Sequence, residues 1–107
     1  MTLPTPEDPA RAPIWDNYAT AQTSQASLGL IPEHAYAVGV EVKGRHLRLR
    51  FQLSHVTKAG ERDMNDIVSE LEALVGQDIF VDSTFEITNY PKVDPHDGVR
   101  RVYLARW

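Results

Sequence analysis

A stripe of apolar residues over positions 64–75 constrains the fold of this chain more than any other feature. Its members are three or four residues apart, which places them on one side of an α-helix. Gly76 follows them as a residue suited to a helix C-terminus. The pattern predicts a helix over 61–75 with Leu71 in mid-stripe, buried against Leu49 and Phe51 of a second layer. The members of the stripe are Met64, Ile67, Val68, Leu71, Leu74 and Val75.

Two runs of alternating residues before that helix predict a β-hairpin. The runs cover 36–42 and 46–53, and in each of them every second residue is a larger apolar one. Such a period of two is typical of strands with one apolar face, and Lys43-Gly44 between the runs is a plausible tight turn. In the second run the apolar residues are Leu47, Leu49, Phe51 and Leu53, and the polar side consists of His46, Arg48, Arg50 and Gln52.

Two further strands are predicted over 79–87 and 99–107, with a proline-containing loop over 89–98 between them. One side of the third strand would carry Phe80, Asp82, Thr84 and Glu86. In the fourth strand we expect Val102 and Leu104 on one face, and Arg101, Tyr103, Ala105 and Trp107 on the other.

A helix is also predicted to begin at Pro13, because proline is favoured in the first turn. Gly29 and Pro32 then stop it. The middle of this helix, residues 20–27, has only alanine as an apolar residue. The helix therefore buries little by itself, and its middle is suited to close packing against another element. The expected buried residues are Ile14, Tyr18, Ala21 and Leu28, flanked by Trp15.

The predicted order of elements is αββαββ in a chain of 107 residues, which is the length of one domain. The simplest solution is an α+β two-layer sandwich, with a four-stranded, mostly antiparallel sheet and both helices on one face. The two hairpin-like pairs, each preceded by a helix, suggest a duplicated α-β-β unit. Residues 1–12 contain Pro4, Pro6 and Pro9 and are expected to form a flexible tail before a single domain over 13–107.

The composition excludes several classes of function. The chain has no cysteine, so disulfides, thiolate chemistry and cysteine zinc sites are ruled out. It has neither a signal-peptide pattern nor an apolar run of about 20 residues, so we expect a cytoplasmic protein without membrane contact. The net charge of −4 makes nucleic acid an unfavourable partner.

No familiar catalytic motif is present, so no catalytic residue, metal or cofactor is predicted. A glycine-rich phosphate loop and a Gly-x-Ser-x-Gly motif are both missing, and we expect no serine to have a local histidine partner. No two of the histidines are three to five residues apart, which is the spacing of a local zinc site. A site built from distant histidines stays open. Another alternative is a small-ligand site or a small enzyme, with its site between the first helix and the sheet. Its candidate residues are Tyr18, Gln22, Gln25, His55 and Tyr90.

Charge is strongly segregated along the chain. Residues 61–87 have a net charge of −7, whereas residues 43–58 have a net charge of +5. One interpretation is a solvated helix face together with acid–base pairs across the sheet. The other is that the acidic helix face docks a basic protein partner. The partner-binding residues would be Asp63, Asp66, Glu70 and Glu72; the alternative surface is the open sheet face, with Arg48, Arg50, Tyr103 and Trp107. Self-association through the open face or the edge strands also stays open.

Several stretches together resemble a group of small uncharacterised bacterial proteins. These stretches are 15–18 running on to 25–30, 66–74 and 95–101. The acidic, cysteine-free α+β layout also resembles many toxin-immunity proteins. The resemblance implies a protein-binding module, an immunity-type inhibitor of a bacterial toxin, and it implies no particular site residues.

Overall fold

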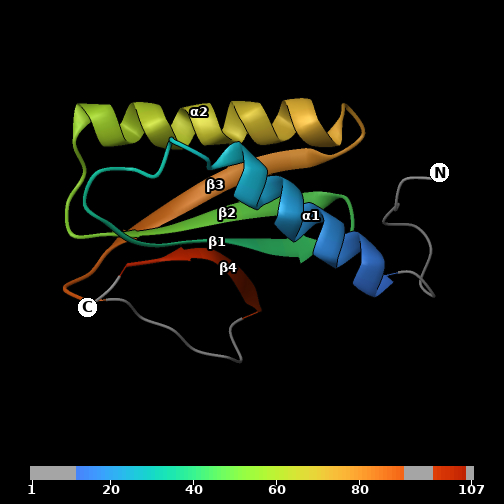
Figure 1. Cartoon of the computed structure of the whole chain (residues 1–107), viewed down its shortest axis with the longest axis horizontal. Helices are drawn as coiled ribbons and strands as arrows, with labels where there is room; N and C mark the ends of the chain where they lie inside the picture. The colour runs from blue at the N-terminus through green and yellow to red at the C-terminus, as the bar shows by residue number, and fades with distance from the viewer. Residues whose placement is uncertain (1–11, 91–97, 106–107) are drawn as a thin grey trace.

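The computed structural model of the chain describes residues 12–90 and 98–105, in which two helices accompany a four-stranded sheet (Figure 1). The predicted tail lies outside the described residues, except for Ala12 at the start of the first helix. In chain order the elements are α1 (Ala12–Ala26), β1 (Ala35–Lys43), β2 (His46–Leu53), α2 (Lys58–Val75), β3 (Phe80–Ile87) and β4 (Val99–Leu104).

The strands of this sheet lie in the order β3-β2-β1-β4. β1 pairs with β2 and with β4 in antiparallel fashion, whereas β2 and β3 are parallel. The predicted β1–β2 hairpin is confirmed, with Lys43 opposite His46 and Gly44 in the left-handed region at φ 57°. The sheet is therefore mixed and mostly antiparallel.

The expected duplication of an α-β-β unit is wrong, because β3 and β4 do not pair and lie at opposite edges of the sheet. The reason is α2. A helix between two strands carries the chain back along the sheet, so the strand after it runs parallel to the strand before it. The segment 88–98 then separates β3 from β4, which lies beside β1.

The apolar stripe of α2 is confirmed except at Leu74, which is 37% exposed, and the helix begins three residues earlier than predicted. The helix begins after Thr57, whose side-chain oxygen accepts a hydrogen bond from the Gly60 N–H at 2.9 Å. It ends at Gly76, which has a φ of 91° and donates its N–H to the Glu72 carbonyl. Leu71 is fully buried and belongs to the same apolar cluster as Leu49 and Phe51.

The stripe predicted for α1 is wrong at Ile14, Ala21 and Leu28, which are exposed, whereas Tyr18 is partly buried against the core as expected. Ile14 and Leu28 are 49% and 67% exposed. The buried side of the helix is instead formed by Trp15, Ala19, Thr23 and Ala26. The Thr23 hydroxyl donates to the Ala19 carbonyl at 2.9 Å, so this polar group is satisfied within its own helix.

The helices contact each other, and side chains from both join one buried cluster with those of the sheet. α1 also packs on β1 and β4, and α2 packs on β3 (Figure 1). The Trp15 indole N–H donates to the Gly44 carbonyl at 2.9 Å, which ties the start of α1 to the hairpin turn. Arg100 of β4 donates to the Asn17 side chain at 2.8 Å, which is a second polar contact between α1 and the sheet.

Candidate functional site

The candidate partner-binding residues of α2 lie at the molecular surface. We call Asp63, Asp66, Glu70 and Glu72 the acidic surface. Asp66, Glu70 and Glu72 are exposed and Asp63 is half-buried. Asp63, Asp66 and Glu70 are three and four residues apart and form one ridge, and Glu72 lies further round the helix. No side chain of the acidic surface forms an ion pair or hydrogen bond with another residue in 12–90 or 98–105.

Carboxylates of the sheet, unlike those of the acidic surface, form hydrogen bonds or ion pairs with basic or amide groups. The polar face of the sheet, as we call it, is the side away from the buried leucines. Arg48 and Asp82 lie opposite each other in the parallel β2–β3 pair, and two hydrogen bonds of 3.1 Å join the guanidinium to the carboxylate. Residues that line this face are Glu41, His46, Arg48, Arg50, Gln52, Phe80, Asp82, Thr84, Glu86 and Arg101.

The Arg48–Asp82 contact affects the protonation of both groups. Hydrogen bonding to Arg48 holds the pKa of Asp82 below its ordinary value, since it stabilises the charged carboxylate, and burial opposes this only in part. His46 adds to the lowering, with its Nε2 at 3.0 Å from the Asp82 carboxylate. The same hydrogen bond raises the pKa of Arg48. This pair is therefore charged over the whole neutral range.

Two more contacts on the polar face join a carboxylate of one strand to a basic or amide group of the next strand. Arg50 of β2 forms an ion pair with Glu41 of β1. The Gln52 amide donates to the Glu86 carboxylate at 3.0 Å. The expectation of acid–base pairs across the sheet is thus confirmed for Arg48 with Asp82 and for Arg50 with Glu41.

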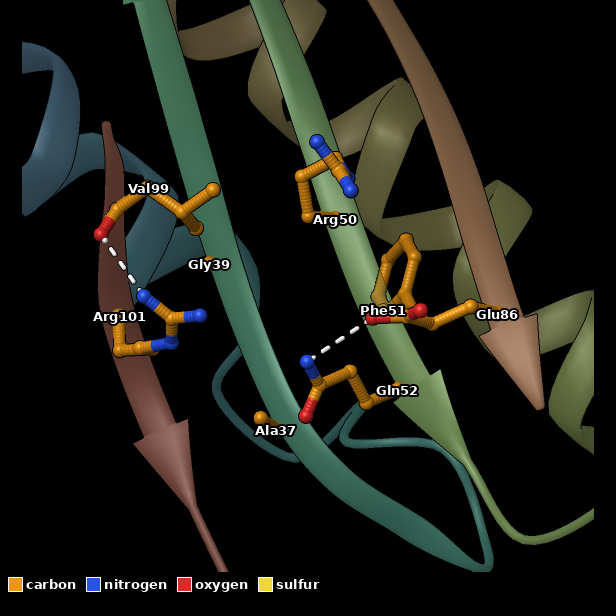
Figure 2. Close-up of a pocket in the computed structure, with 8 residues that line it drawn as sticks. All are labelled: Ala37, Gly39, Arg50, Phe51, Gln52, Glu86, Val99 and Arg101. Atoms are coloured by element: carbon orange, nitrogen blue, oxygen red, sulfur yellow. Dashed lines mark hydrogen bonds between the residues drawn. The ribbon is translucent and has the colours of Figure 1, made fainter. Parts of the chain in front are cut away.

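A small hollow lies in the polar face between β2 and β4 (Figure 2). β1 contributes the small residues Ala37 and Gly39 to it, and Arg50, Gln52 and Arg101 lie around them. A side chain at Gly39 would not fit, because its Cβ would lie 2.5 Å from a Val99 methyl carbon. The volume of the hollow is about 40 Å³. That is room for water, and far less than the roughly 300–1,000 Å³ of small-molecule sites.

Another hollow, of about 210 Å³, lies nearer the hairpin turn and is lined by Glu41, Lys43, His46 and Arg48. Neither hollow is lined by the residues suggested for a site between α1 and the sheet. Within the described part of the chain, no three histidine or carboxylate side chains are grouped so that they could hold a metal ion.

The alternative surface does not come together as one patch. Arg48 and Arg50 lie on the polar face, but Tyr103 lies opposite Val38 and packs against the core. A bulge between Val38 and Gly39 shifts the β1–β4 register, so Tyr103 is on the opposite side of the sheet from Arg101, contrary to the prediction. Trp107 lies outside the described residues.

One contact was missed in the sequence. Ser54 Oγ lies 3.0 Å from Nδ1 of the neighbouring His55, so the expectation that no serine has a histidine partner is wrong. The ring of His34 lies 3.8 Å from that of His55, centroid to centroid. The sequence offered one indication of this contact, namely that Ser54 and His55 are neighbours in the chain. Both histidines are exposed, and an exposed pair lacks the water-excluding surroundings that activate a nucleophile.

The comparisons with known proteins add no relative. No protein-family model matches the chain, and no curated protein matches it either. Across residues 12–90 and 98–105, neither helix combines the length and the apolar character needed to cross a membrane.

Proposed function

We propose that the chain is a cytoplasmic protein-binding module that docks a basic protein partner through the acidic surface of α2. The observation that carries this proposal is the contrast between the carboxylates. Those of the polar face are engaged by Arg48, Arg50 or Gln52, whereas those of the acidic surface have no partner among the described residues. An immunity-type inhibitor of a bacterial toxin is the specific form of this function that the layout resembles.

Unpaired carboxylates along one ridge attract a positively charged partner before contact is made. Such attraction raises the association rate and sets orientation, and added salt weakens it. Charges that already pair within the protein act at short range and contribute less to steering. The acidic surface therefore supports docking better than the polar face does.

The proposal includes the two-layer αββαββ arrangement, with both helices on one sheet face and the polar face open. The contact between α1 and α2 supports it, as does the single buried cluster that both helices share with the sheet. The small-ligand or enzymatic alternative with a site between α1 and the sheet gains no support from the hollows. The one beside Gly39 has the volume of a few waters, and the larger one of about 210 Å³ is lined by none of the residues suggested for that site.

The test uses the full chain, immobilised to capture binding proteins from a lysate of the cells that make it. Association of the purified captured protein is then measured at two ionic strengths. The double variant Asp66→Asn/Glu70→Gln should slow association and reduce its salt dependence, because it removes two unpaired charges. Extending the change to Asp63 and Glu72 should enlarge both effects.

A charge-matched control is Asp16→Asn/Glu33→Gln, which alters the net charge equally at positions outside α2. It should leave association close to that of the unmodified protein. Equal association rates for the two double variants would contradict docking through α2. Arg48 and Arg50 of the polar face would then be the next residues to replace.

A further inference from the structure

Within 12–90 and 98–105, no strand pairs with the outer edge of β3. β3 comprises the eight residues Phe80–Ile87 and pairs with β2 without a register shift, from His46 opposite Phe80 to Leu53 opposite Ile87. Its other side has no neighbouring strand among the described residues (Figure 1). An edge of this kind presents a row of backbone donors and acceptors to any incoming strand.

The hydrogen bonds to β2 identify which backbone groups of β3 face outward. The Phe80 N–H donates to the Arg45 carbonyl at 2.8 Å, and the Thr88 N–H donates to the Leu53 carbonyl at 2.8 Å. Backbone groups alternate between the two sides of a strand, so the even-numbered residues of β3 bond to β2. The outward N–H and C=O groups therefore belong to Val81, Ser83, Phe85 and Ile87.

Apolar side chains accompany these outward groups. Phe85 and Ile87 are 51% and 54% exposed, on the side of the sheet that carries the buried leucines of β2. β3 has no proline, lysine or arginine, and its ladder has no bulge, although these are the devices that usually protect an edge. The strand thus combines free hydrogen-bonding groups with apolar surface that an added strand would cover.

We propose that an extended segment of the protein partner adds to this edge as a fifth strand, with lysine or arginine alternating with apolar residues. Residues 78–90 contain three carboxylates and no basic residue. Among the described residues Glu86 bonds to the neutral amide of Gln52, which does not cancel its negative charge. An alternating segment would place apolar residues beside Phe85 and Ile87, and basic residues on the side of Glu86.

Charge also favours a basic strand of a partner over β3 of a second copy of the chain at this edge. Two β3 strands side by side would bring Asp82 and Glu86 of one copy near those of the other, in a chain with a net charge of −4. Like charges across a strand pair are unfavourable. The inference rests on the proposed function in one respect, namely that the partner is a basic protein.

The probe is a synthetic peptide of alternating lysine and valine, blocked at both ends and matched in length to the eight residues of β3. It is titrated into the isotope-labelled full chain, followed by amide NMR shifts and hydrogen exchange. We expect shifts along β3 and slower exchange of the four outward amides. A peptide of alternating glutamate and valine should not bind. Equal affinities of the two peptides would contradict the proposal that the added strand is basic.

The decisive variant is Ser83→Pro, since proline removes an outward N–H and leaves the bonds to β2 intact. Its affinity for the lysine–valine peptide should fall by about tenfold or more, whereas Ser83→Val, which keeps the donor, should stay within about threefold. Unchanged affinity of Ser83→Pro, or shifts centred on the polar face, would overturn the proposal. Should Ser83→Pro fail to fold, Phe85→Lys keeps every backbone bond and should weaken binding, because a charged group then replaces the apolar surface that the valines of the peptide would cover.

Sedimentation of the free chain tests the second copy. A dimer that Ser83→Pro converts to a monomer would mean that the edge pairs with itself, and would overturn the proposal.

Binding of the captured partner to both variants distinguishes failure of this inference from failure of the proposed function. If Asp66→Asn/Glu70→Gln slows association and Ser83→Pro does not affect binding, the β3 inference alone fails. If Ser83→Pro weakens binding and the α2 variant does not slow association, docking through the acidic surface alone fails.

Discussion

The two helices bury one side each by different means. α2 inserts large apolar side chains, with Met64, Ile67 and Leu71 almost fully buried. α1 buries Ala19 and Thr23 completely, and these residues are small. Large side chains fill a space between elements, whereas small ones allow two backbones to approach closely. A helix with a weak apolar pattern can therefore bury residues as completely as a helix with a strong one.

Trp15 is the exception in α1, because it is a large side chain that is only 3% exposed. Its ring lies 5.9 Å from that of Tyr18, and its indole N–H bonds to Gly44. One aromatic residue thus supplies much of the apolar contact that α2 distributes over several side chains.

Trp15→Ala should produce the largest loss of stability. Removing a buried tryptophan leaves a cavity and an unpaired carbonyl at Gly44, and such changes cost about 3–5 kcal/mol. Urea unfolding followed by circular dichroism measures the change in free energy. Trp15→Phe, which keeps most of the apolar volume, should cost clearly less. Equal costs for both variants would show that the indole hydrogen bond, and not the volume, anchors α1.

Leu71→Ala tests the other helix at its most buried position. Leu71 is fully buried, so we expect a cost of about 2–5 kcal/mol from lost burial and a residual cavity. Leu74→Ala is the matched control in the same helix, because Leu74 is 37% exposed and should cost less. The same unfolding measurement applies. A larger loss at Leu74 than at Leu71 would contradict the orientation of α2.

The buried side of α2 could be predicted better than that of α1, because α2 buries large apolar residues and α1 buries mostly small ones. Leu71 and its neighbours repeat at helical spacing with large apolar residues, so the sequence alone identifies the buried side of α2. In α1 the same approach favours Ile14 and Leu28, because it weights large residues. The small residues of 20–27 predicted close packing, but not which of them would be buried. The close approach that buries small residues depends on the partner element, which the sequence of α1 does not reveal.

The sheet shows the same division between local and long-range information. The β1–β2 hairpin was predictable because its turn and both strands are adjacent in sequence. The parallel pairing of β3 with β2 depends on where α2 packs, and the bulge at Val38 that turns Tyr103 toward the core has no sequence signature. For the candidate site, segregated charge indicated acid–base pairing across the sheet, but the particular Arg48–Asp82 pair and the outer edge of β3 both required the strand order.

Ala19→Leu tests close packing in α1 directly. Extra methylenes in a tight contact force neighbouring atoms apart, and overpacking costs about 1–3 kcal/mol. Ala21→Leu is the matched control, since Ala21 is exposed on the same helix. It should change the free energy of unfolding by less than about 0.5 kcal/mol. A similar small effect at both positions would mean that the buried side of α1 has room to spare.

Leu28→Ala should have the smallest effect, and it separates the predicted stripe of α1 from the observed one. Leu28 follows the end of the helix and is 67% exposed, so its side chain loses little contact with water on folding. Exposed substitutions of this kind usually stay within about 0.5 kcal/mol. Differential scanning calorimetry at several protein concentrations is the suitable measurement. A loss of stability comparable to that of Leu71→Ala would mean that Leu28 is buried, as the sequence predicted. A loss that appears only at high concentration would instead indicate that Leu28 is covered by another molecule.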